Sequence, residues 1–298
     1  MSKCAIIGGG PAGLNAALYL KRAGLDVFVI EKDVPGGEML KTDKIENYLG
    51  FENISGGDLA YNMAKQVKDI GAWIIKDRVI RVFKEDNKDG KFILEMVNDR
   101  LEVDYVVVAT GREPRKLDVR GSDDLTGRCL SYCAVCDGYF YKGLEVAVIG
   151  GGDAALTEAL YLSDLCSKVY VLVRKDVRAS EILKKRVTSK DNIVILKNTE
   201  VRSFDYDDDE LKGVTLSNGE FLNVSGIFVA IGGAPSLDFL SDMDVNLKDG
   251  YIVTDERMRT NIPGLYAVGD VRYKDFYQII TAASDGAIAA LSIKEDVR

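Results

Sequence analysis

The segment Cys4-Ala5-Ile6-Ile7-Gly8-Gly9-Gly10-Pro11-Ala12-Gly13 is a short apolar strand that runs directly into a glycine-rich turn. The residues that follow predict a helix over 14–23, a helix C-cap at Gly24, and a second strand over 27–30 that ends at Glu31. A strand–turn–helix–strand unit of about 30 residues is typical of dinucleotide-binding sites.

Each glycine of this Gly-x-Gly-x-x-Gly pattern has a physical role in such a site. Gly8 allows the tight turn, Gly10 lets the backbone approach a pyrophosphate, and Gly13 allows close packing of the helix. The phosphates would rest on the helix N-terminus, where N–H groups and the helix dipole favour negative charge. Glu31, at the strand end, would accept hydrogen bonds from an adenosine ribose.

A second unit repeats the pattern around Gly150-Gly151-Gly152-Asp153-Ala154-Ala155. Strands are expected over 146–149 and 169–173, with a helix over 155–165 between them. Arg174 lies 24 residues after Gly150, as Glu31 lies 23 after Gly8, so the second unit is a structural repeat. The strand end here carries cations, which suit the 2′-phosphate of NADPH better than NADH. They are Arg174, Lys175 and Arg178. The alternative is a solvated basic strand end.

The remaining strands indicate how the two units are joined. Apolar strands over 105–110, 227–231 and 265–268 each run into glycine, whereas those over 92–97 and 213–216 precede hairpin turns. We therefore predict an α/β fold with two Rossmann-like three-layer (ββα) dinucleotide-binding domains, the second inserted in the first. The first domain is expected to span 1–115 and 234–298, and the inserted domain 116–233.

Composition excludes several classes of function. The chain has 298 residues, no histidine, a formal net charge of −8 and a pI near 4.9. The absence of histidine excludes Ser-His-Asp hydrolysis and His-ligated metal, and the acidic balance argues against nucleic acid. No apolar run approaches the length of a membrane span, and the N-terminus lacks a signal-peptide pattern, so we expect a cytoplasmic protein. The acidic run 205–210 is expected to be a solvated turn.

The segment Cys133-Ala134-Val135-Cys136-Asp137 lies between the two glycine turns. Cysteines at this spacing can close a disulfide within one helical turn and exchange it with another disulfide. With no histidine available, Asp137 is the candidate to carry the proton. Half of a zinc site is the alternative, but no second Cys-x-x-Cys exists to complete it. Cys4 and Cys166 are expected in the core, and Cys129 has no predicted role.

Taken together, these motifs resemble the low-molecular-weight thioredoxin reductases over essentially the whole chain. The residues that carry the resemblance are Gly8–Gly13 with Glu31, Gly36-Gly37, Glu46-Asn47-Tyr48-Leu49-Gly50, Ala109-Thr110-Gly111 with Pro114, Cys133–Gly138, the second glycine turn, Gly269-Asp270-Val271-Arg272, and Gln278 through Asp285-Gly286.

The resemblance implies FAD in the first domain, NADPH in the inserted one, a homodimer, and thioredoxin or a thioredoxin-like protein as partner. Cys136 would lie nearer the flavin, Cys133 would attack thioredoxin, and Asp137 would be the acid–base residue. Asp270 would bind the ribityl chain. Domain rotation is expected at hinges near 115–116 and 232–234.

The implied FAD residues are Gly8, Gly10, Pro11, Ala12, Gly13, Glu31, Lys32, Gly37, Glu38, Asn47, Thr110, Gly111, Gly269, Asp270, Gln278 and Ile279. The implied NADPH residues are Gly150, Gly152, Asp153, Ala154, Ala155, Arg174, Lys175 and Arg178.

The chain departs from the family pattern mainly on the nicotinamide side. The segment 173–178 lacks the usual histidine and is one residue shorter, and Ala154, Thr157 and Tyr277 replace the usual residues; Glu38 also replaces a common glutamine. We predict a thioredoxin-disulfide reductase that uses NADPH, FAD and the Cys133–Cys136 disulfide. The alternatives are the same dithiol chemistry with ferredoxin or a deazaflavin as donor, a redox-sensing flavoprotein without turnover, and a reductase with a different disulfide partner.

Overall fold

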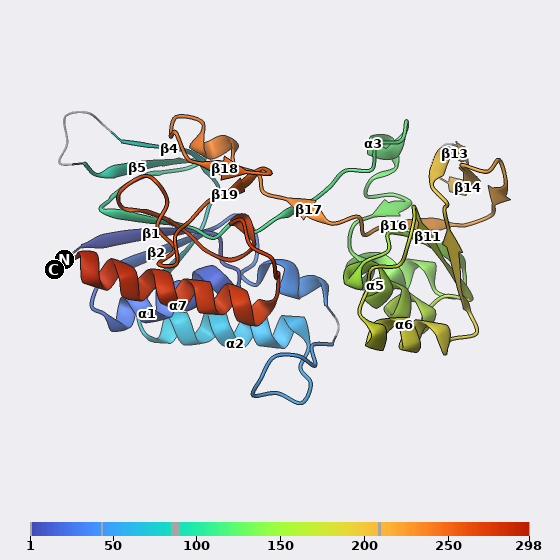
Figure 1. Ribbon diagram of the computed structural model, residues 1–298, viewed down its shortest axis with the longest axis horizontal. Coiled ribbons are helices and arrows are strands. Elements are labelled where there is room, and N and C mark those ends of the chain that lie inside the picture. Colours follow the sequence, from blue (N-terminus) through green and yellow to red (C-terminus); the bar gives the residue numbers. More distant parts are fainter. Residues whose placement is uncertain (1, 43, 85–89, 208–209, 298) are drawn as a thin grey trace. The chain divides into compact units, whose positions relative to one another are not determined.

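The computed structural model describes residues 2–42, 44–84, 90–207 and 210–297. The chain forms two compact units, one made of residues 1–113 and 234–298 and the other of residues 114–233. The colours of Figure 1 show that the first unit combines both ends of the chain, blue and red, and that the second is green to orange. The sequence had placed the first boundary between residues 115 and 116.

The first unit is built on a five-stranded parallel sheet of order β20-β7-β1-β2-β3. Its strands are β1 (Lys3–Ile7), β2 (Asp26–Glu31), β3 (Trp73–Lys76), β7 (Tyr105–Val108) and β20 (Leu265–Ala267). The chain leaves β1 toward β2 on one side and returns through β7 on the other. The carboxyl ends of β1 and β7 therefore meet at a switch point, where open α/β sheets bind ligands.

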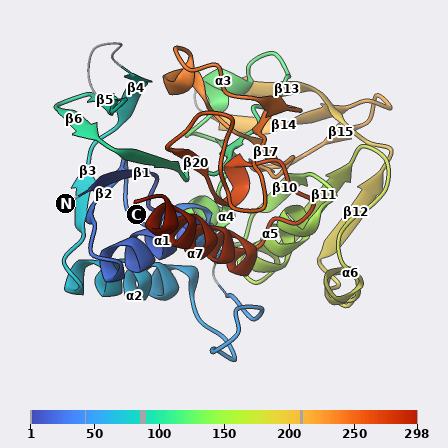
Figure 2. The same cartoon turned by 60° about the vertical axis from the view of Figure 1, so that its left-hand side comes forward.

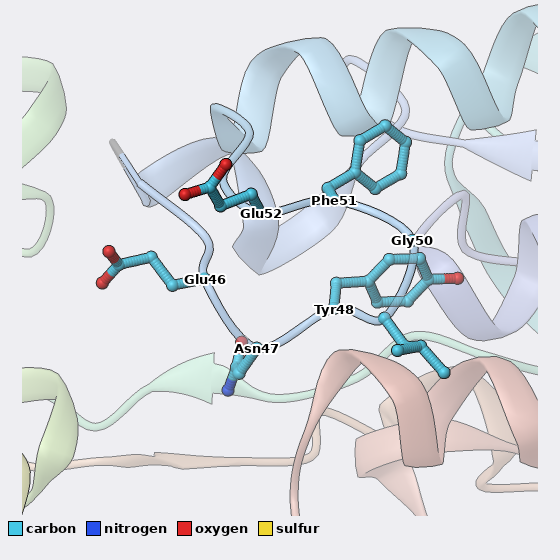
Figure 3. A pocket seen from close by; sticks show the side chains of 7 residues that line it. Glu46, Asn47, Tyr48, Gly50, Phe51 and Glu52 are labelled. Carbon is cyan, nitrogen blue, oxygen red and sulfur yellow. The ribbon is translucent and has the colours of Figure 1, made fainter.

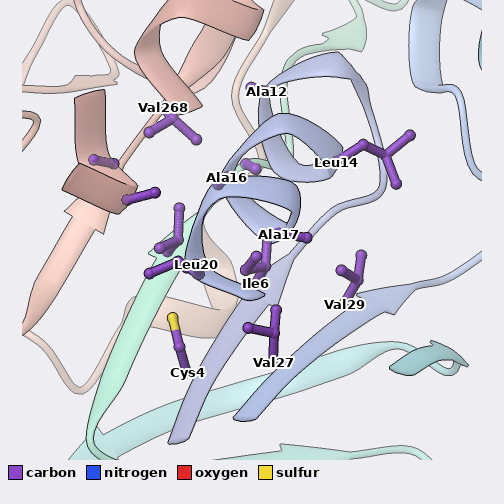
Figure 4. Packing of buried hydrophobic residues seen from close by; sticks show 14 of the residues in the cluster. Cys4, Ile6, Ala12, Leu14, Ala16, Ala17, Leu20, Val27, Val29 and Val268 are labelled. Carbon is purple, nitrogen blue, oxygen red and sulfur yellow. The ribbon is translucent and has the colours of Figure 1, made fainter. Parts of the chain in front are cut away.

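Side chains alternate between the two faces of this sheet, as the period of a strand requires. Ile6 and Val29 pack with helices α1 (Pro11–Arg22), α2 (Gly56–Asp69) and α7 (Ile279–Asp296), and Figure 4 shows the part of this core around α1. Ala5 and Ile30 point to the opposite face. There they pack with the antiparallel sheet of β4 (Val79–Lys84), β5 (Phe92–Met96) and β6 (Arg100–Val103).

Helices α1 and α7 lie side by side, as Figures 1 and 2 both show. Small residues allow this close approach, because a side chain at Gly286 would overlap the backbone of Ala12. The Asn15 side chain also donates to the carbonyl of Ala283 at 2.6 Å. The shorter elements of the first unit are η1 (Gly37–Lys41), η3 (Asp238–Leu240), β18 (Leu247–Lys248), β19 (Tyr251–Ile252) and η4 (Gly269–Val271).

The second unit repeats this plan. Its parallel sheet has the order β12-β11-β10-β16-β9, made of β9 (Leu130–Ser131), β10 (Glu145–Ile149), β11 (Lys168–Val173), β12 (Ile193–Lys197) and β16 (Gly226–Val229). Val146 and Val148 face the core with α5 (Asp153–Ser163) and α6 (Glu181–Thr188). Ala147 and Ile149 face the antiparallel strands β13 (Val201–Asp207), β14 (Glu210–Leu216) and β15 (Phe221–Leu222). The predicted three-layer ββα class is confirmed.

Three short elements and two connecting strands complete the second unit and its boundaries. They are α3 (Ser122–Leu125), α4 (Ala134–Asp137), η2 (Gly138–Tyr141), β8 (Glu113–Pro114) and β17 (Gly233–Ala234). β8 and β17 pair where the chain passes between the units, and the N–H of Arg115 donates to the carbonyl of Gly232 at 2.9 Å.

The predicted bounds of two helices are wrong. α1 begins at Pro11 rather than residue 14, since proline at the first helical position needs no hydrogen bond for its nitrogen. α5 covers 153–163 rather than 155–165, so Cys166 lies three residues beyond its end instead of directly after it. The strands predicted over 105–110 and 227–231 stop at residues 108 and 229. Within the acidic run 205–210, Asp208 and Asp209 lie outside the described residues.

Candidate active site

In the first glycine turn, Gly8 and Gly13 pack closely against backbone atoms, whereas Gly10 faces open space. Gly8 has φ +107°, and a side chain there would overlap the carbonyl of Ala109 at the end of β7. A side chain at Gly13 would overlap the carbonyl of Gly8. At Gly10, the N-cap of α1, an added Cβ would meet no atom within 4 Å. The turn therefore leaves open space in front of the helix N-terminus, as a bound pyrophosphate would need.

Glu31 is fixed beside this turn at the end of β2. Its Oε2 accepts from the N–H of Gly9 at 2.6 Å, and its Oε1 accepts from the N–H of Asp33 at 3.0 Å. The carboxylate is thereby oriented without a cation. Lys32 does not join it, because its Nζ pairs with Glu113 at 2.7 Å on the surface.

Two buried polar atoms at the carboxyl edge of the same sheet have no hydrogen-bond partner among the described residues. They are Thr110 Oγ1, just after β7, and Asp270 Oδ1 in η4. Asp270 Oδ1 forms an ion pair with the Nζ of Lys274 at 3.5 Å but no hydrogen bond, while its Oδ2 accepts from Arg112 at 3.2 Å. Since buried polar groups normally have partners, these orphan atoms fit a polar ligand such as FAD at this edge.

The segment that carries Asp270 is held by a buried carboxylate that the sequence reasoning gave no role. Asp285 of α7 is 6% exposed. Its Oδ2 accepts from the N–H of Gly269 at 3.1 Å and from Lys274 at 3.2 Å, and its Oδ1 accepts from Arg272 at 3.0 Å. A buried charge is tolerated only when it is paired and hydrogen-bonded, and this one is. The signal available in the sequence was an acid within the apolar, small-residue stretch 279–293 of this helix.

The remaining residues implied for the flavin fall into two groups. Asn47 and Gln278 come together, with Nδ2 of Asn47 donating to Oε1 of Gln278 at 3.0 Å, and Gln278 caps α7 immediately before Ile279. Glu38, by contrast, is exposed and pairs with Lys41 at 2.8 Å. Gly37, next to it, has φ +58°.

Asn47 also belongs to a loop, 46–52, that lines a pocket of about 490 Å³. Figure 3 shows the Glu46 and Glu52 side chains toward one end of this loop and the rings of Tyr48 and Phe51 toward the other. The pocket contains none of the other residues implied for the flavin, so we base the site on the glycine turn and not on this pocket.

Tyr277 is one of the positions at which the chain departs from the family pattern. Its ring lies 4.2 Å from the guanidinium carbon of Arg112 and 5.9 Å from the ring of Tyr251. Arg112 thus joins Tyr277 to Asp270, because the same guanidinium pairs with the Asp270 carboxylate at 3.2 Å.

Cys133 and Cys136 form a disulfide in the second unit, with Cα atoms 5.3 Å apart. Cys133 is the N-cap of α4, and its sulfur lies 3.2 Å from the N–H of Cys136. In this oxidised pair Cys133 is 8% exposed whereas Cys136 is exposed. The Cys133 sulfur must therefore become accessible after reduction if it is to attack a partner disulfide.

Asp137 ends α4 directly after the pair. Its Oδ2 accepts a hydrogen bond from the hydroxyl of Ser131 at 2.6 Å. The same hydroxyl oxygen accepts from the N–H of Cys133 at 3.0 Å. Ser131 was not singled out from the sequence, since a serine at the end of an apolar strand carries no recognisable signal.

The other cysteines are core residues. Cys4, Cys129 and Cys166 are each at most 5% exposed. Burial raises the pKa of the Cys166 thiol to about 11 and also raises that of Cys4. Thiols held protonated in this way are poor nucleophiles, so the predicted core role of Cys4 and Cys166 agrees with the structure.

The second glycine turn repeats the geometry of the first. A side chain at Gly150, with φ +148°, would overlap the carbonyl of Ala230, and a Cβ at Gly152 would meet no atom within 4 Å. Ala155 takes the place of the third glycine, inside the turn and fully buried. The open position again lies before a helix N-terminus, that of α5.

The loop after β11 folds back onto this turn. The N–H of Arg178 donates to the carbonyl of Gly151 at 2.6 Å, and the N–H of Ser180 donates to Oδ1 of Asp153 at 2.6 Å. Asp153 thus fixes the loop, and Ala154 next to it is exposed. The Arg174, Lys175 and Arg178 side chains are exposed, and within residues 2–42, 44–84, 90–207 and 210–297 none has an ion-pair partner.

Comparisons with known proteins agree with this geometry. A sequence profile described as pyridine nucleotide-disulphide oxidoreductase matches residues 2–286. The chain is 39% identical to the thioredoxin reductase of Listeria monocytogenes serovar 1/2a, over 98% of this chain and 92% of that protein.

Two solved structures are also similar over the whole chain. The thioredoxin reductase of Lactococcus lactis in its FR conformation has a TM-score of 0.94 at 38% identity, covering 100% of this chain and 99% of that one. The thioredoxin reductase of T. acidophilum has a TM-score of 0.93 at 33% identity, with the same coverage.

Proposed function

The chain belongs to the pyridine nucleotide-disulphide oxidoreductase family, and on that basis we propose that it is a thioredoxin-disulfide reductase that passes electrons from NADPH through FAD and the Cys133–Cys136 disulfide to thioredoxin. The observation that carries the proposal is the Cys133–Cys136 disulfide. Cys133 is the N-cap of α4, Asp137 follows Cys136 directly, and the same unit contains the second glycine turn. A structural disulfide would not need an adjacent carboxylate or a second dinucleotide site.

The first unit supports FAD as the flavin. Gly10 leaves space before α1, Glu31 presents a fixed carboxylate for a ribose, and the unpartnered Thr110 and Asp270 oxygens lie where polar groups of the ligand would be needed. When bound, the flavin would supply two-electron transfer between a nicotinamide and the disulfide.

The second unit supports NADPH. The strand end that carries Glu31 in the first unit carries exposed Arg174, Lys175 and Arg178 in the second. A 2′-phosphate is stabilised by such cations and repelled by an acid. The backbone bond from Arg178 to Gly151 keeps the cationic loop beside the glycine turn, so both groups can bind one dinucleotide.

The protein's own groups then perform disulfide exchange. After reduction, the Cys133 thiolate attacks one sulfur of thioredoxin, and Cys136 displaces thioredoxin from the mixed disulfide. Asp137 carries protons between the sulfur atoms, since the chain has no histidine to do so.

The test is anaerobic mixing of the FAD-loaded protein with NADPH or NADH, followed by the visible flavin spectrum. We expect NADPH to bleach the flavin faster than NADH. Cys133→Ser should keep this bleaching and lose turnover of thioredoxin, whereas the matched control Cys166→Ser, a buried thiol in the same unit, should keep both. Turnover of thioredoxin by Cys133→Ser would contradict the assigned role.

One feature of the second unit favours ferredoxin or a deazaflavin as an alternative electron donor. The loop at 173–178 lacks the histidine and one residue of the usual nucleotide motif. If neither NADPH nor NADH bleaches the flavin, reduced ferredoxin or a reduced deazaflavin is the donor to try, with the same disulfide chemistry downstream.

The proposal also covers the oligomeric state and the cellular location of the protein. The family resemblance leads us to expect a homodimer, and the acidic balance and the lack of a signal-peptide pattern or long apolar run lead us to expect that it acts in the cytoplasm without nucleic acid or a membrane. No helix within the described residues is long and apolar enough to cross a membrane. Hinge rotation is expected at the two strands that pass between the units, near 115–116 and 232–234.

A further inference from the structure

Ser131 is a buried side chain at the end of an edge strand. It is 6% exposed, and β9 holds its backbone by parallel pairing, with Ser131 opposite Phe228 of β16. The strand and α4 are separated by only two residues. Ser131 is therefore placed rigidly beside the Cys133–Cys136 segment.

Its hydroxyl joins the two ends of that segment. The oxygen accepts from the N–H of Cys133 at 3.0 Å, which fixes its position. Its single proton can go to Asp137 Oδ2 at 2.6 Å or to the carbonyl of Cys133 at 3.3 Å. The proton goes to Asp137, because the contact is shorter and a hydrogen bond to a carboxylate is stronger than one to a neutral carbonyl.

The phenol of Tyr141, which interacts electrostatically with Asp137, does not compete for its hydrogen bond. Tyr141 is buried, and its hydroxyl donates to the carbonyl of Arg128 at 3.0 Å. Burial, then Cys129 and Asp137, raise the pKa of Tyr141 to about 12, so the phenol stays neutral. In the part of the chain that the structure describes, Ser131 is the only side chain that donates to Asp137.

We propose that Ser131 is a positioning residue for Asp137, an assignment that rests on the function proposed above. The hydroxyl holds Oδ2 and leaves the other oxygen, Oδ1, to take and return protons. Without this bond the carboxylate would rotate, and proton transfer requires a donor and acceptor held in hydrogen-bond reach.

The proton path balances over one exchange. The Cys133 thiol gives its proton to Asp137 and attacks the partner disulfide; the partner S–S bond breaks and the leaving thiolate takes that proton. The Cys136 thiol then gives its proton to Asp137 and attacks Cys133. The Cys133–Cys136 bond forms, and the second partner thiolate takes the proton. Two electrons and two protons have moved from the protein dithiol to the partner.

The test is a double-mutant cycle of Ser131→Ala and Asp137→Asn in the FAD-loaded protein. Asp137→Asn should lower kcat for thioredoxin by at least about 100-fold. Ser131→Ala alone should lower kcat by about tenfold with little change in KM, because it alters the proton carrier and not the binding of thioredoxin. In the Asp137→Asn background, Ser131→Ala should lower kcat by less than about twofold.

The matched control is Ser163→Ala. Ser163 is also buried in the second unit, and its hydroxyl donates to the carbonyl of Leu160 at 2.7 Å. It should leave kcat unchanged. The initial rate at which the donor bleaches the flavin should be the same in all of these variants, because this first step precedes the transfer of electrons to the disulfide; an unchanged initial rate shows that the flavin site is intact.

Two results would overturn the assignment. An equal loss from Ser131→Ala with and without Asp137 would mean that the serine only supports the turn. Wild-type kcat in Asp137→Asn would mean that there is no proton carrier to position.

A second substrate distinguishes an error in the proposed partner from an error in the role of Ser131. The pre-reduced variants are mixed with bis(2-hydroxyethyl) disulfide, whose leaving thiolate must be protonated, and no donor or thioredoxin is present. A wild-type protein that reduces this disulfide but not thioredoxin would contradict the proposed partner. The cycle measured on the small disulfide would still decide the role of Ser131 by the same criteria.

Discussion

The buried carboxylate of Asp285 gives the sharpest test of how the Asp270 segment is held. Asp285→Ala leaves Arg272 and Lys274 without this partner, and it leaves the N–H of Gly269 without an acceptor. The side chains are little exposed, at 9% for Asp285, 15% for Arg272 and 10% for Lys274. Breaking such a buried pair typically costs about 3–5 kcal/mol.

We expect the lower end of that range, about 3 kcal/mol, because Lys274 keeps Asp270 at 3.5 Å. Without Asp285, Lys274 should move toward Asp270, and the Asp270 carboxylate would then be less available to the flavin. The affinity of the apoprotein for FAD should therefore fall by at least about tenfold.

The assay uses the single tryptophan of the chain. Trp73 lies in β3 of the first unit, so its fluorescence during urea unfolding of the apoprotein reports on the unit that contains Asp285. The matched control is Asp69→Ala, which breaks an exposed pair with Lys65 and should leave the transition unchanged. A loss below about 1 kcal/mol in Asp285→Ala would refute the reasoning.

Three further predictions follow from single sites. Gly10→Ala should leave apoprotein stability unchanged and weaken FAD binding at least about tenfold, because its Cβ enters open space; isothermal titration with FAD checks this, and unchanged affinity would contradict it. Cys136→Ser should trap thioredoxin as a mixed disulfide on Cys133, visible on a non-reducing gel; trapping by Cys133→Ser instead would reverse the two roles. The raised pKa of Tyr141, about 12, means that its contribution to stability is complete below the ordinary value near 10 and is lost as the pH rises toward 12. Tyr141→Phe should therefore flatten the fall in melting temperature between pH 10 and 12, and an unchanged slope would contradict this.

The fold was predictable because local and non-local signals agree. In β1 and β10 the apolar runs ending in glycine predicted buried parallel strands, and the spacings of 23 residues from Gly8 to Glu31 and 24 residues from Gly150 to Arg174 predicted the repeat. Helix starts were missed, since Pro11 and Asp153 are the first residues of α1 and α5 but stand before the apolar pattern and carry no hydrophobic signal.

Site residues could be predicted from the sequence only where local backbone geometry demands one residue type. Gly8 and Gly150 could be assigned because a side chain at either position overlaps a backbone carbonyl. Asp285 and Ser131 could not, because their roles depend on partners that the fold brings together. Asp285 contacts residues 11–16 positions away, and Ser131 is an ordinary strand residue until α4 turns back toward it.

The account depends on electrons reaching the Cys133–Cys136 disulfide from the flavin. Anaerobic dithionite titration of the FAD-loaded protein measures this without any nicotinamide or thioredoxin. The wild-type chain should take up about four electrons per flavin, two for the flavin and two for the disulfide, and Cys133→Ser about two. An uptake of about two electrons by both proteins would contradict the account.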